Sequence, residues 1–434
     1  MTNENLTRAL PARFVLAVTV GGVIGLGILR GPGEIAEVVT EPSLYLALWL
    51  VAGLFVLLST AVSAELVGMT PRSGGFYSLI RRAYGPYAGF VIGWADWLTY
   101  AADLALKAVV IIEFVAILIP ESAAWSTALA ITVTTVFAVI QLRGIGLGAL
   151  IQEIGTSLIG LVIFGLALLL FFVGTPDNGA ASTMPADNSL NAWSLVIATI
   201  IFTYDGWFYA SYFTGEIRDG PGAVARSCIK AMVVVIVLYM LLHLALVKSV
   251  GLASLAGSDL ALARALELAI NPAAGTFIVV AAILILLSHQ NLEYMSGPRV
   301  LQALAEDGFA ARHAQDVGKG GNPIFAVLFT WLVSVGLILL GGFEFLLLFS
   351  VFLFVPLYLA LIIGIFILRK REPNAERPYR AWGHPYSTVF CLVAWTMITL
   401  FQAYVERETA VYAVVMVAVS WPVYRYLARR SGRG

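Results

Sequence analysis

The sequence has few charged residues and almost no cysteine. Of its 434 residues only 12% are charged, whereas 60% are hydrophobic and the mean hydropathy is +0.90. This composition excludes an ordinary soluble domain and predicts a polytopic membrane protein. Cys228 and Cys391 are the only cysteines, and both fall in or beside apolar segments. We therefore expect neither a disulfide framework nor a cysteine metal site.

The motifs of several enzyme classes are also missing. The sequence contains no phosphate-binding loop, no GxSxG motif and no HExxH spacing among its four histidines. Its basic residues lie in short loops without interleaved aromatic residues, so no nucleic-acid partner is expected. We predict a protein that is not an enzyme and that needs no cofactor or metal.

Long hydrophobic runs make up most of the chain instead. Most of them reach the ~20 residues needed to cross a hydrocarbon core of about 30 Å. The first run carries glycines and lacks a small-residue cleavage site, so we interpret it as a retained span rather than a signal peptide. The sequence predicts twelve transmembrane helices, at about 12–39, 43–69, 86–119, 124–142, 146–174, 192–217, 230–250, 274–297, 323–341, 343–368, 388–405 and 409–428.

The placement of positive charge predicts the orientation. If both termini are cytoplasmic, Arg30 and Lys107 fall within spans, and only Lys248, Arg264 and Arg407 of the 26 lysines and arginines lie outside. The other cations lie in cytoplasmic segments, as the positive-inside rule requires. We expect a multi-pass protein of the cell (inner) membrane, surrounded by lipid, with both termini in the cytoplasm.

Two predicted spans are interrupted. The stretch from Gly21 to Gly33 carries six glycines and a proline, and the stretch from Ile201 to Ala210 carries Gly206 in its middle. A helix break at bilayer depth leaves backbone groups unpaired and persists only where it lines a cavity or binds a ligand. Interrupted spans in corresponding halves of a chain indicate the substrate site of a secondary transporter. The alternative is that these glycines only permit close helix packing.

The polarity of the two breaks favours a zwitterionic ligand. Unwinding near Gly25, Leu26 and Gly27 would expose amides at the start of a half-helix, where an anion is stabilised. Unwinding around Phe202 to Gly206 would free carbonyls at the end of another half-helix, which favours a cation.

Several motifs together resemble a known family, the amino acid, polyamine and organocation (APC) transporters. They are GGVIGLGIL in the first span, FTYDGW followed by GEIRDGPGAVARS, SGPRVLQALAEDGFAARHA followed by GNP, and RPYRAWGHP before span 11. Within that superfamily the chain resembles the L-type amino acid transporters and their bacterial relatives. The resemblance covers spans 1–10 and the loop that follows.

The resemblance implies an all-α, 5+5 inverted-repeat (LeuT-like) core with discontinuous helices 1 and 6. The first repeat would occupy residues 1–174, the second 190–370, and two peripheral spans 388–429. Some animal relatives carry a disulfide-linked heavy chain, but this sequence offers no cysteine on the outside for one. No obligate heavy-chain subunit is therefore expected.

The resemblance also implies the substrate contacts. The substrate carboxylate would meet the amides of Gly25, Leu26 and Gly27, and the ammonium would meet the carbonyls of Val23, Phe202 and Asp205. Leu26 stands where relatives often have serine. Phe202 resembles the family's aromatic gate, with Tyr204 and Trp207 nearby, although core packing explains Trp207 equally well.

Ionisable residues at membrane depth are candidates for ion coupling, because an unpaired charge there is costly. Asp96, Tyr100, Asp103 and Lys107 share one face of span 3 by their spacing, and Tyr100 is a candidate pocket residue. A neutralising Asp103–Lys107 pair is favoured over a proton relay.

In span 8, His289 and Glu293 lie one turn apart beside Ser288, and a hydrogen-bonded structural pair is favoured over proton coupling. The lysine that some relatives carry in span 5, seven residues after a glutamine, is absent, because Ile159 occupies that position after Gln152. The coupling ion stays open, with a proton or no ion favoured over sodium.

We therefore expect a secondary active transporter or exchanger of small, neutral L-amino acids that works by alternating access. Asp205 and Glu293 keep cationic amino acids, polyamines or another small organic solute open as alternatives. A channel or a membrane-embedded enzyme is less favoured, because neither a continuous polar lining nor paired catalytic groups appear in the sequence.

Overall fold

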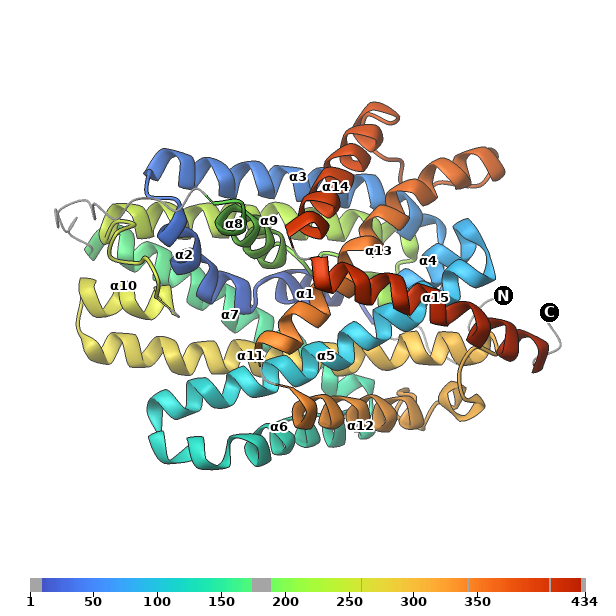
Figure 1. Cartoon of the computed structure of the whole chain (residues 1–434), viewed down its shortest axis with the longest axis horizontal. Coiled ribbons are helices and arrows are strands. Elements are labelled where there is room, and N and C mark those ends of the chain that lie inside the picture. The colour runs from blue at the N-terminus through green and yellow to red at the C-terminus, as the bar shows by residue number, and fades with distance from the viewer. Residues whose placement is uncertain (1–9, 174–188, 259, 342, 406, 431–434) are drawn as a thin grey trace.

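The computed structural model describes residues 10–173, 189–258, 260–341, 343–405 and 407–430. These residues form fifteen α-helices and three short 3₁₀ helices, and no β-strand occurs among them. The expected all-α class is therefore confirmed. Most of the helices run along a common direction, and α1 begins at the end of the bundle where α15 ends (Figure 1).

The predicted apolar segments coincide with helices or interrupted helix pairs. In the first half these are α1 (Ala12–Val23), α2 (Leu26–Val38), α3 (Pro42–Met69), α5 (Pro86–Leu118), α6 (Ser126–Leu142) and α7 (Ile145–Val173). In the second half they are α8 (Leu190–Thr203), η2 (Tyr209–Glu216), α9 (Pro221–Ser249), α11 (Pro272–Glu306), α12 (Ile324–Leu340), α13 (Phe343–Arg371), α14 (Tyr386–Val405) and α15 (Arg407–Arg430).

Seven of the described helical segments are long and apolar enough to cross a membrane by themselves. One of them is the α1–α2 pair, and α8 and α12 are shorter apolar helices. The chain is therefore a helical protein with the features of a multi-pass membrane protein.

Local sequence signals account for several helix starts. The Glu41 side chain accepts a hydrogen bond from the amide of Leu44 at 2.6 Å and so caps α3, which begins at Pro42. Ser189 caps α8 in the same way through the amide of Ala192, at 3.1 Å. Each cap satisfies one backbone donor that the first helical turn leaves without a partner.

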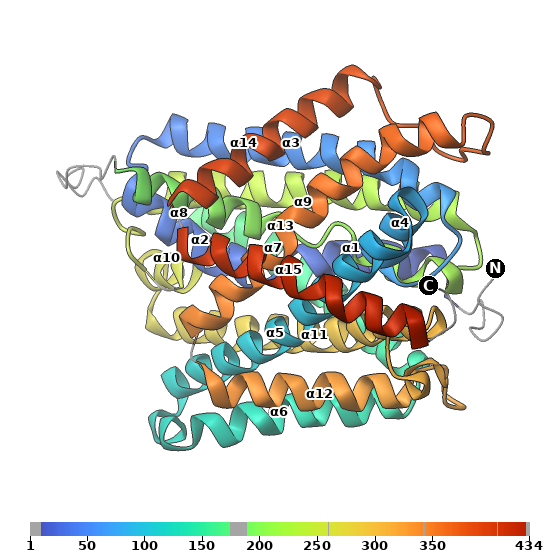
Figure 2. The ribbon, with the colours of Figure 1, turned by 45° about the vertical axis from the view of Figure 1, so that its right-hand side comes forward.

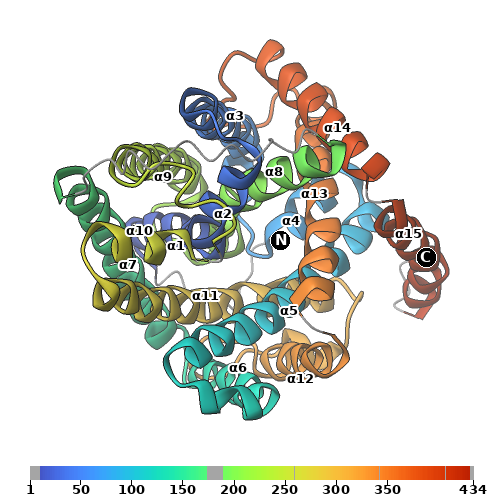
Figure 3. The same ribbon diagram turned by 60° about the vertical axis from the view of Figure 1, so that its left-hand side comes forward.

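The interrupted pair α1–α2 lies in the interior of the bundle. Of the seven candidate spans it is the most enclosed. In its apolar stretch 83% of the residues are buried, against at most 56% in the others. Viewed nearly along the helices, α1 and α2 are surrounded by α3, α9, α7, α11 and α8 (Figure 3). α1 packs on α7 and α9, and α2 packs on α8. The centre of the bundle is therefore built around a broken helix.

Short helices connect the long ones: α4 (Gly75–Tyr84), η1 (Pro120–Trp125), α10 (Ala261–Ala269) and η3 (Arg312–Gln315). The long connection 250–271 between α9 and α11 contains α10, which packs on α11 and α2. The amide of Gly257 also donates to the carbonyl of Gly33 at 3.2 Å, so this connection is hydrogen-bonded to the second half of α2. The other long connection, 175–191, falls almost wholly outside the described residues.

The last two helices lie at the edge of the bundle, and α14 packs on α3 and α8 as well as on α13. Both α14 and α15 pack on α13, and α15 also touches α5. Figure 2 shows α14 and α15 passing over the outside of the bundle. Neither one lies beside α1 or α2.

Candidate functional site: two facing helix interruptions

The first interruption lies between α1 and α2. Ile24 and Gly25 have non-helical backbone angles, with φ −79° and ψ 90° at Ile24 and φ −137° and ψ −145° at Gly25. The break is shorter than predicted, because Leu26 and Gly27 already belong to the first turn of α2. Within the described part of the chain, no side chain caps that turn. Its amides therefore remain available as donors, as the substrate-carboxylate prediction requires.

The second interruption separates α8 from η2. The helix continues through Phe202 to Thr203, so the predicted start of unwinding at Phe202 is two residues too early. Residues 204–208 are irregular, and Gly206 adopts a left-handed φ of 98°. The carbonyl of Phe202 accepts from the amide of Asp205 at 3.2 Å.

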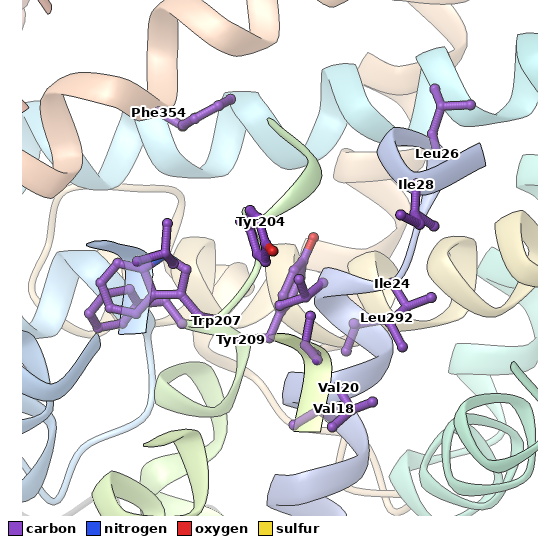
Figure 4. Close-up of a cluster of buried hydrophobic side chains, with 14 of the residues drawn as sticks. Val18, Val20, Ile24, Leu26, Ile28, Tyr204, Trp207, Tyr209, Leu292 and Phe354 are labelled. Atoms are coloured by element: carbon purple, nitrogen blue, oxygen red, sulfur yellow. The ribbon is translucent and has the colours of Figure 1, made fainter. Parts of the chain in front are cut away.

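The two interruptions face each other at glycine contacts. A Cβ atom on Gly27 would lie 2.6 Å from the Cα of Thr203, and one on Gly206 would collide with the carbonyl of Gly22. Ile24 and Leu26 lie at the turn between α1 and α2, beside Tyr204 and Trp207 of the irregular segment and Tyr209 of η2 (Figure 4). The glycines therefore serve close packing as well as the break, so the two readings of the motif are compatible.

Side chains already bind two carbonyls at the end of α1. Tyr239 on α9 donates its hydroxyl to the carbonyls of Val23 at 3.0 Å and Thr203 at 3.2 Å. The Nε2 atom of His289 on α11 lies 3.0 Å from the carbonyl of Ile24. The hydroxyl of Tyr239 thus connects the end of α1 to the end of α8. Nothing in the sequence singled out Tyr239, because it lies in an unbroken apolar run.

The candidate aromatic residues differ in their surroundings. Phe202 is half-buried, whereas Tyr204 is fully buried and donates to the carbonyl of Trp49 at 3.0 Å. The ring of Trp207 stacks on that of Tyr358, with centroids 5.2 Å apart. Tyr204 and Trp207 are thus held in the core, and of the three only Phe202 is partly accessible.

Tyr100 lies among tyrosines of η2. Its ring centroid is 5.8 Å from that of Tyr209 and 5.1 Å from that of Tyr212. Tyr212 also donates to Asp96 at 2.8 Å. Asp96 and Tyr100, two residues of the polar face predicted on span 3, therefore contact η2.

An ionic cluster joins α5 to α11. The ammonium of Lys107 contacts Glu293 directly and lies 3.4 Å from Asp103 Oδ2. The exposed fraction of the side chain is 5% for Lys107 and 0% for Glu293. The predicted Asp103–Lys107 pair is present, and Glu293 is a second partner that the sequence did not indicate. Among the described residues, Asp103 Oδ1 and Glu293 Oε2 have no hydrogen-bond partner.

The predicted hydrogen bond between His289 and Glu293 is wrong. His289 turns to the carbonyl of Ile24, and Glu293 turns to Lys107 and to the hydroxyl of Tyr209 at 3.5 Å. Ser288 is buried beside Gly155 of α7, and its hydroxyl has no partner among the described residues. Spacing of one turn placed His289 and Glu293 near each other but could not show which neighbours they face.

The carboxylate of Asp205 is also engaged. Its Oδ1 atom accepts a hydrogen bond from the hydroxyl of Tyr358 on α13. The contact directs this side chain towards α13, and it links the second interruption to a helix that the sequence did not connect with it.

A buried ion pair closes the end of the bundle where α1 begins. Arg299 on α11 contacts Glu216 at the end of η2 through Nε at 2.6 Å and Nη2 at 3.1 Å, and it also contacts Asn322. Main-chain hydrogen bonds of 3.1 Å run from Leu10 to Glu216 and from Arg218 to Leu10. The charge pattern predicted that Arg299 lies in a cytoplasmic segment outside the spans, but its side chain is only 1% exposed.

A second set of charges lies at the same end of the bundle. Arg72, in the loop after α3, contacts Asp307 at 2.9 Å and Glu306 at 3.0 Å. Burial opposes the charge of Arg72, but these two carboxylates raise the pKa of its guanidinium above the usual value.

Comparison with known proteins identifies the family. A profile of the amino acid permease family matches residues 14–423. The chain is 22% identical to the serine/threonine exchanger SteT of Bacillus subtilis, over 99% of both chains. It is 24% identical to the gamma-aminobutyric acid permease of Bacillus subtilis, over 98% of this chain and 95% of that one.

An animal relative has a similar identity to this chain but is longer. The large neutral amino acids transporter small subunit 2 of Mus musculus is 23% identical, over 94% of this chain and 78% of that one. Since the family profile covers nearly the whole chain, this protein belongs to the amino acid permease family of the APC superfamily and is a transporter rather than an enzyme.

Proposed function

We propose that this permease is a secondary transporter or exchanger of small, neutral L-amino acids that works by alternating access. The observation that carries the proposal is the pair of helix interruptions that face each other in the interior of the bundle. Irregular backbone is tolerated at this depth where it binds a ligand or lines a cavity.

The polarity of these backbone ends matches an amino acid. The uncapped first turn of α2 offers the amides of Leu26 and Gly27 to the substrate carboxylate. The ends of α1 and α8 offer carbonyls to the ammonium, where the helix dipole adds partial negative charge. Because these contacts come from the main chain, they recognise the part that all amino acids share.

Contacts within the protein that already occupy two carboxylates near the site favour neutral substrates. Lys107 neutralises Glu293, and Tyr358 holds the carboxylate of Asp205. Neither carboxylate is therefore free to attract a cationic substrate side chain without competition.

Counterflow in proteoliposomes tests the proposal. Labelled alanine, serine or leucine should exchange in a saturable way, and purified protein should be stabilised by free amino acids but not by their esters. Absence of saturable exchange across the amino acids would overturn the proposal. Conductance in a planar bilayer far above carrier turnover would indicate a channel.

A surplus of buried and half-buried carboxylates supports a second candidate, transport of cationic amino acids or polyamines. Asp96, Asp103, Asp205 and Glu293 lie around the site, and Lys107 is the one lysine or arginine that contacts any of them within the described residues. Saturable exchange of labelled lysine or putrescine, with none of alanine or serine, would favour this candidate over the first.

We further propose that coupling involves a proton or no ion rather than sodium. The support is that a protein N–H group, that of His289, already binds the carbonyl of Ile24 at the first interruption. Uptake measured at two pH values, each with and without sodium, tests this. A strict sodium requirement would contradict it.

We propose that the chain has twelve spans, with a 5+5 inverted repeat at 1–174 and 190–370 and two peripheral spans at 388–429. We also propose that both termini are cytoplasmic and that no partner subunit is obligatory. The support is that each apolar segment coincides with helix and that the first helix of each half is broken. Single cysteines in a background without Cys228 and Cys391 test the topology. Ala123→Cys should react with an impermeant reagent in intact cells, and Asn374→Cys only after permeabilisation. The reverse pattern would refute the orientation.

A further inference from the structure

The Lys107 ammonium occupies a place made for a cation. Its side chain extends from α5 into the protein, with its Nζ atom between Asp103 Oδ2 and Glu293 Oε1. Two carboxylate oxygens of the cluster, Asp103 Oδ1 and Glu293 Oε2, have no hydrogen-bond partner among the described residues. One ammonium thus serves two carboxylates, and a charge left unpaired at this depth would be strongly unfavourable.

The cluster adjoins the proposed substrate site on two sides. Glu293 accepts from the hydroxyl of Tyr209, the first residue of η2 after the second interruption. One helical turn from Glu293, His289 binds the carbonyl of Ile24 at the first interruption, and a Cβ atom on Gly25 would lie 2.8 Å from its ring. A substrate held by both interruptions would therefore have this cluster within reach of its side chain.

Lysine carries the same group as a cationic substrate, a primary ammonium on a flexible aliphatic chain. We propose that Lys107 is a specificity-determining residue whose ammonium occupies the position that would otherwise accept the side-chain ammonium of a cationic amino acid. The inference rests on the proposed transport of neutral amino acids. It assigns the exclusion of cationic substrates to one side chain.

Removing that side chain should convert the specificity. In Lys107→Ala the two carboxylates lose their cation, and lysine or ornithine should supply it. We expect the ratio of cationic to neutral amino acid uptake to rise by about tenfold or more, a change worth ~1.4 kcal/mol of relative affinity. Ornithine and propylamine should also raise the thermal stability of purified Lys107→Ala but not that of the wild type.

Two further variants keep the test decisive if repulsion between the carboxylates unfolds Lys107→Ala. Lys107→Ala/Asp103→Asn leaves one carboxylate, so the gain of cationic uptake should persist. Adding Glu293→Gln to that variant removes the last carboxylate, so the gain should vanish. Lys248→Ala is the matched control, since Lys248 is an exposed residue at the end of α9 and its removal should leave the specificity unchanged.

The failures of the two proposals give different results. If the wild type exchanges neutral amino acids and a folded Lys107→Ala or Lys107→Ala/Asp103→Asn protein does so without gaining cationic uptake or stabilisation, the role of Lys107 is refuted and the transport proposal stands. Equal uptake of lysine and alanine by the wild type would also refute the role of Lys107. A wild type that transports no amino acid refutes the transport proposal itself.

Discussion

Single glycines hold the two interruptions in contact, and their effect depends on what their missing side chain would meet. At Gly27 an added Cβ atom would lie 2.6 Å from the backbone Cα of Thr203, which cannot move without shifting α8. At Gly25 the same atom would lie 2.8 Å from the ring of His289, which is a side chain rather than backbone, although its Nε2 atom lies 3.0 Å from the carbonyl of Ile24. The two glycines of one motif therefore differ in how much substitution they tolerate.

We predict that Gly27→Ala lowers stability by about 1–3 kcal/mol, as overpacking usually does, and reduces exchange strongly. Gly25→Ala should reduce exchange with a smaller loss of stability. Thermal unfolding in detergent and counterflow measure the two effects. A Gly27→Ala protein with wild-type stability would contradict the close contact between α2 and α8.

Gly160 provides the control for these substitutions. It lies within α7, and an added Cβ atom would meet nothing within 4 Å. Gly160→Ala should therefore leave exchange unchanged and stability unchanged or slightly higher, because alanine favours helix.

Glu293 is the residue whose protonation is easiest to test. Glu293→Gln removes the charge that faces Lys107 and leaves Asp103 as the partner of the ammonium. If Glu293 exchanges a proton during transport, the pH dependence of uptake should flatten in this variant. A pH profile equal to that of the wild type would exclude Glu293 as the proton carrier.

At the level of elements, one hydroxyl connects the broken helices. Tyr239 on α9 lies within hydrogen-bond distance of the carbonyls of Val23 and Thr203, yet it has a single hydrogen to donate. The two carbonyls therefore share one donor. This leaves one of them ready for a second donor such as a substrate ammonium.

Tyr239→Phe removes that donor, and we expect a loss of stability of about 1 kcal/mol together with a clear change in the exchange rate. Tyr204→Phe is matched to it, since Tyr204 also donates one buried hydrogen bond, to the carbonyl of Trp49. Tyr204→Phe should cost similar stability with less effect on exchange. Equal effects of both variants on exchange would show that the Tyr239 hydroxyl contributes no more to transport than another buried hydrogen bond.

The sequence was sufficient to predict the broken helices but not their exact limits. Clustered glycines, with Gly206 in the later segment, indicated where the backbone departs from helix. The second break nevertheless begins at Tyr204 rather than at Phe202, and the first spans only Ile24 and Gly25. These limits depend on contacts between segments far apart in the chain, such as Gly206 against Gly22, which no local pattern contains.

Side-chain partners were harder to predict than helices. Spacing placed His289 beside Glu293, but each one faces a different helix. Arg299 was treated as a loop charge because it follows an apolar run, whereas α11 continues past it and buries it against Glu216. Side-chain pairing between two helices depends on how each helix is rotated about its own axis. The residues of one helix do not determine that rotation, because it depends on the helices packed against it.

At the scale of the whole molecule, the Arg299–Glu216 pair joins α11 to η2 at the end of the bundle where α1 begins. Arg299→Ala would leave a buried carboxylate without its partner, so we predict a loss of about 3–5 kcal/mol. The apparent melting temperature of purified protein measures it. Arg299→Lys keeps the charge but loses the two-pronged contact, so its loss should be intermediate.

The ion pair is best tested together with its partner. In Arg299→Ala/Glu216→Gln no buried charge remains unpaired, and the double variant should be more stable than Arg299→Ala alone. If the double variant loses as much as the two single variants combined, the two side chains do not interact as the structure indicates.

The short main-chain pairing between Leu10 and residues 216–218 has a practical consequence for handling this protein. Leu10, just before α1, is hydrogen-bonded to residues 216 and 218 at the end of η2. A displacement of the backbone at Leu10 is therefore transmitted to η2. An affinity tag or fluorescent fusion joined close to Leu10 would disturb this pairing. One joined beyond α15 would follow a helix that packs on neither α1 nor α2. Purification tags for functional work should therefore be placed at the C-terminus.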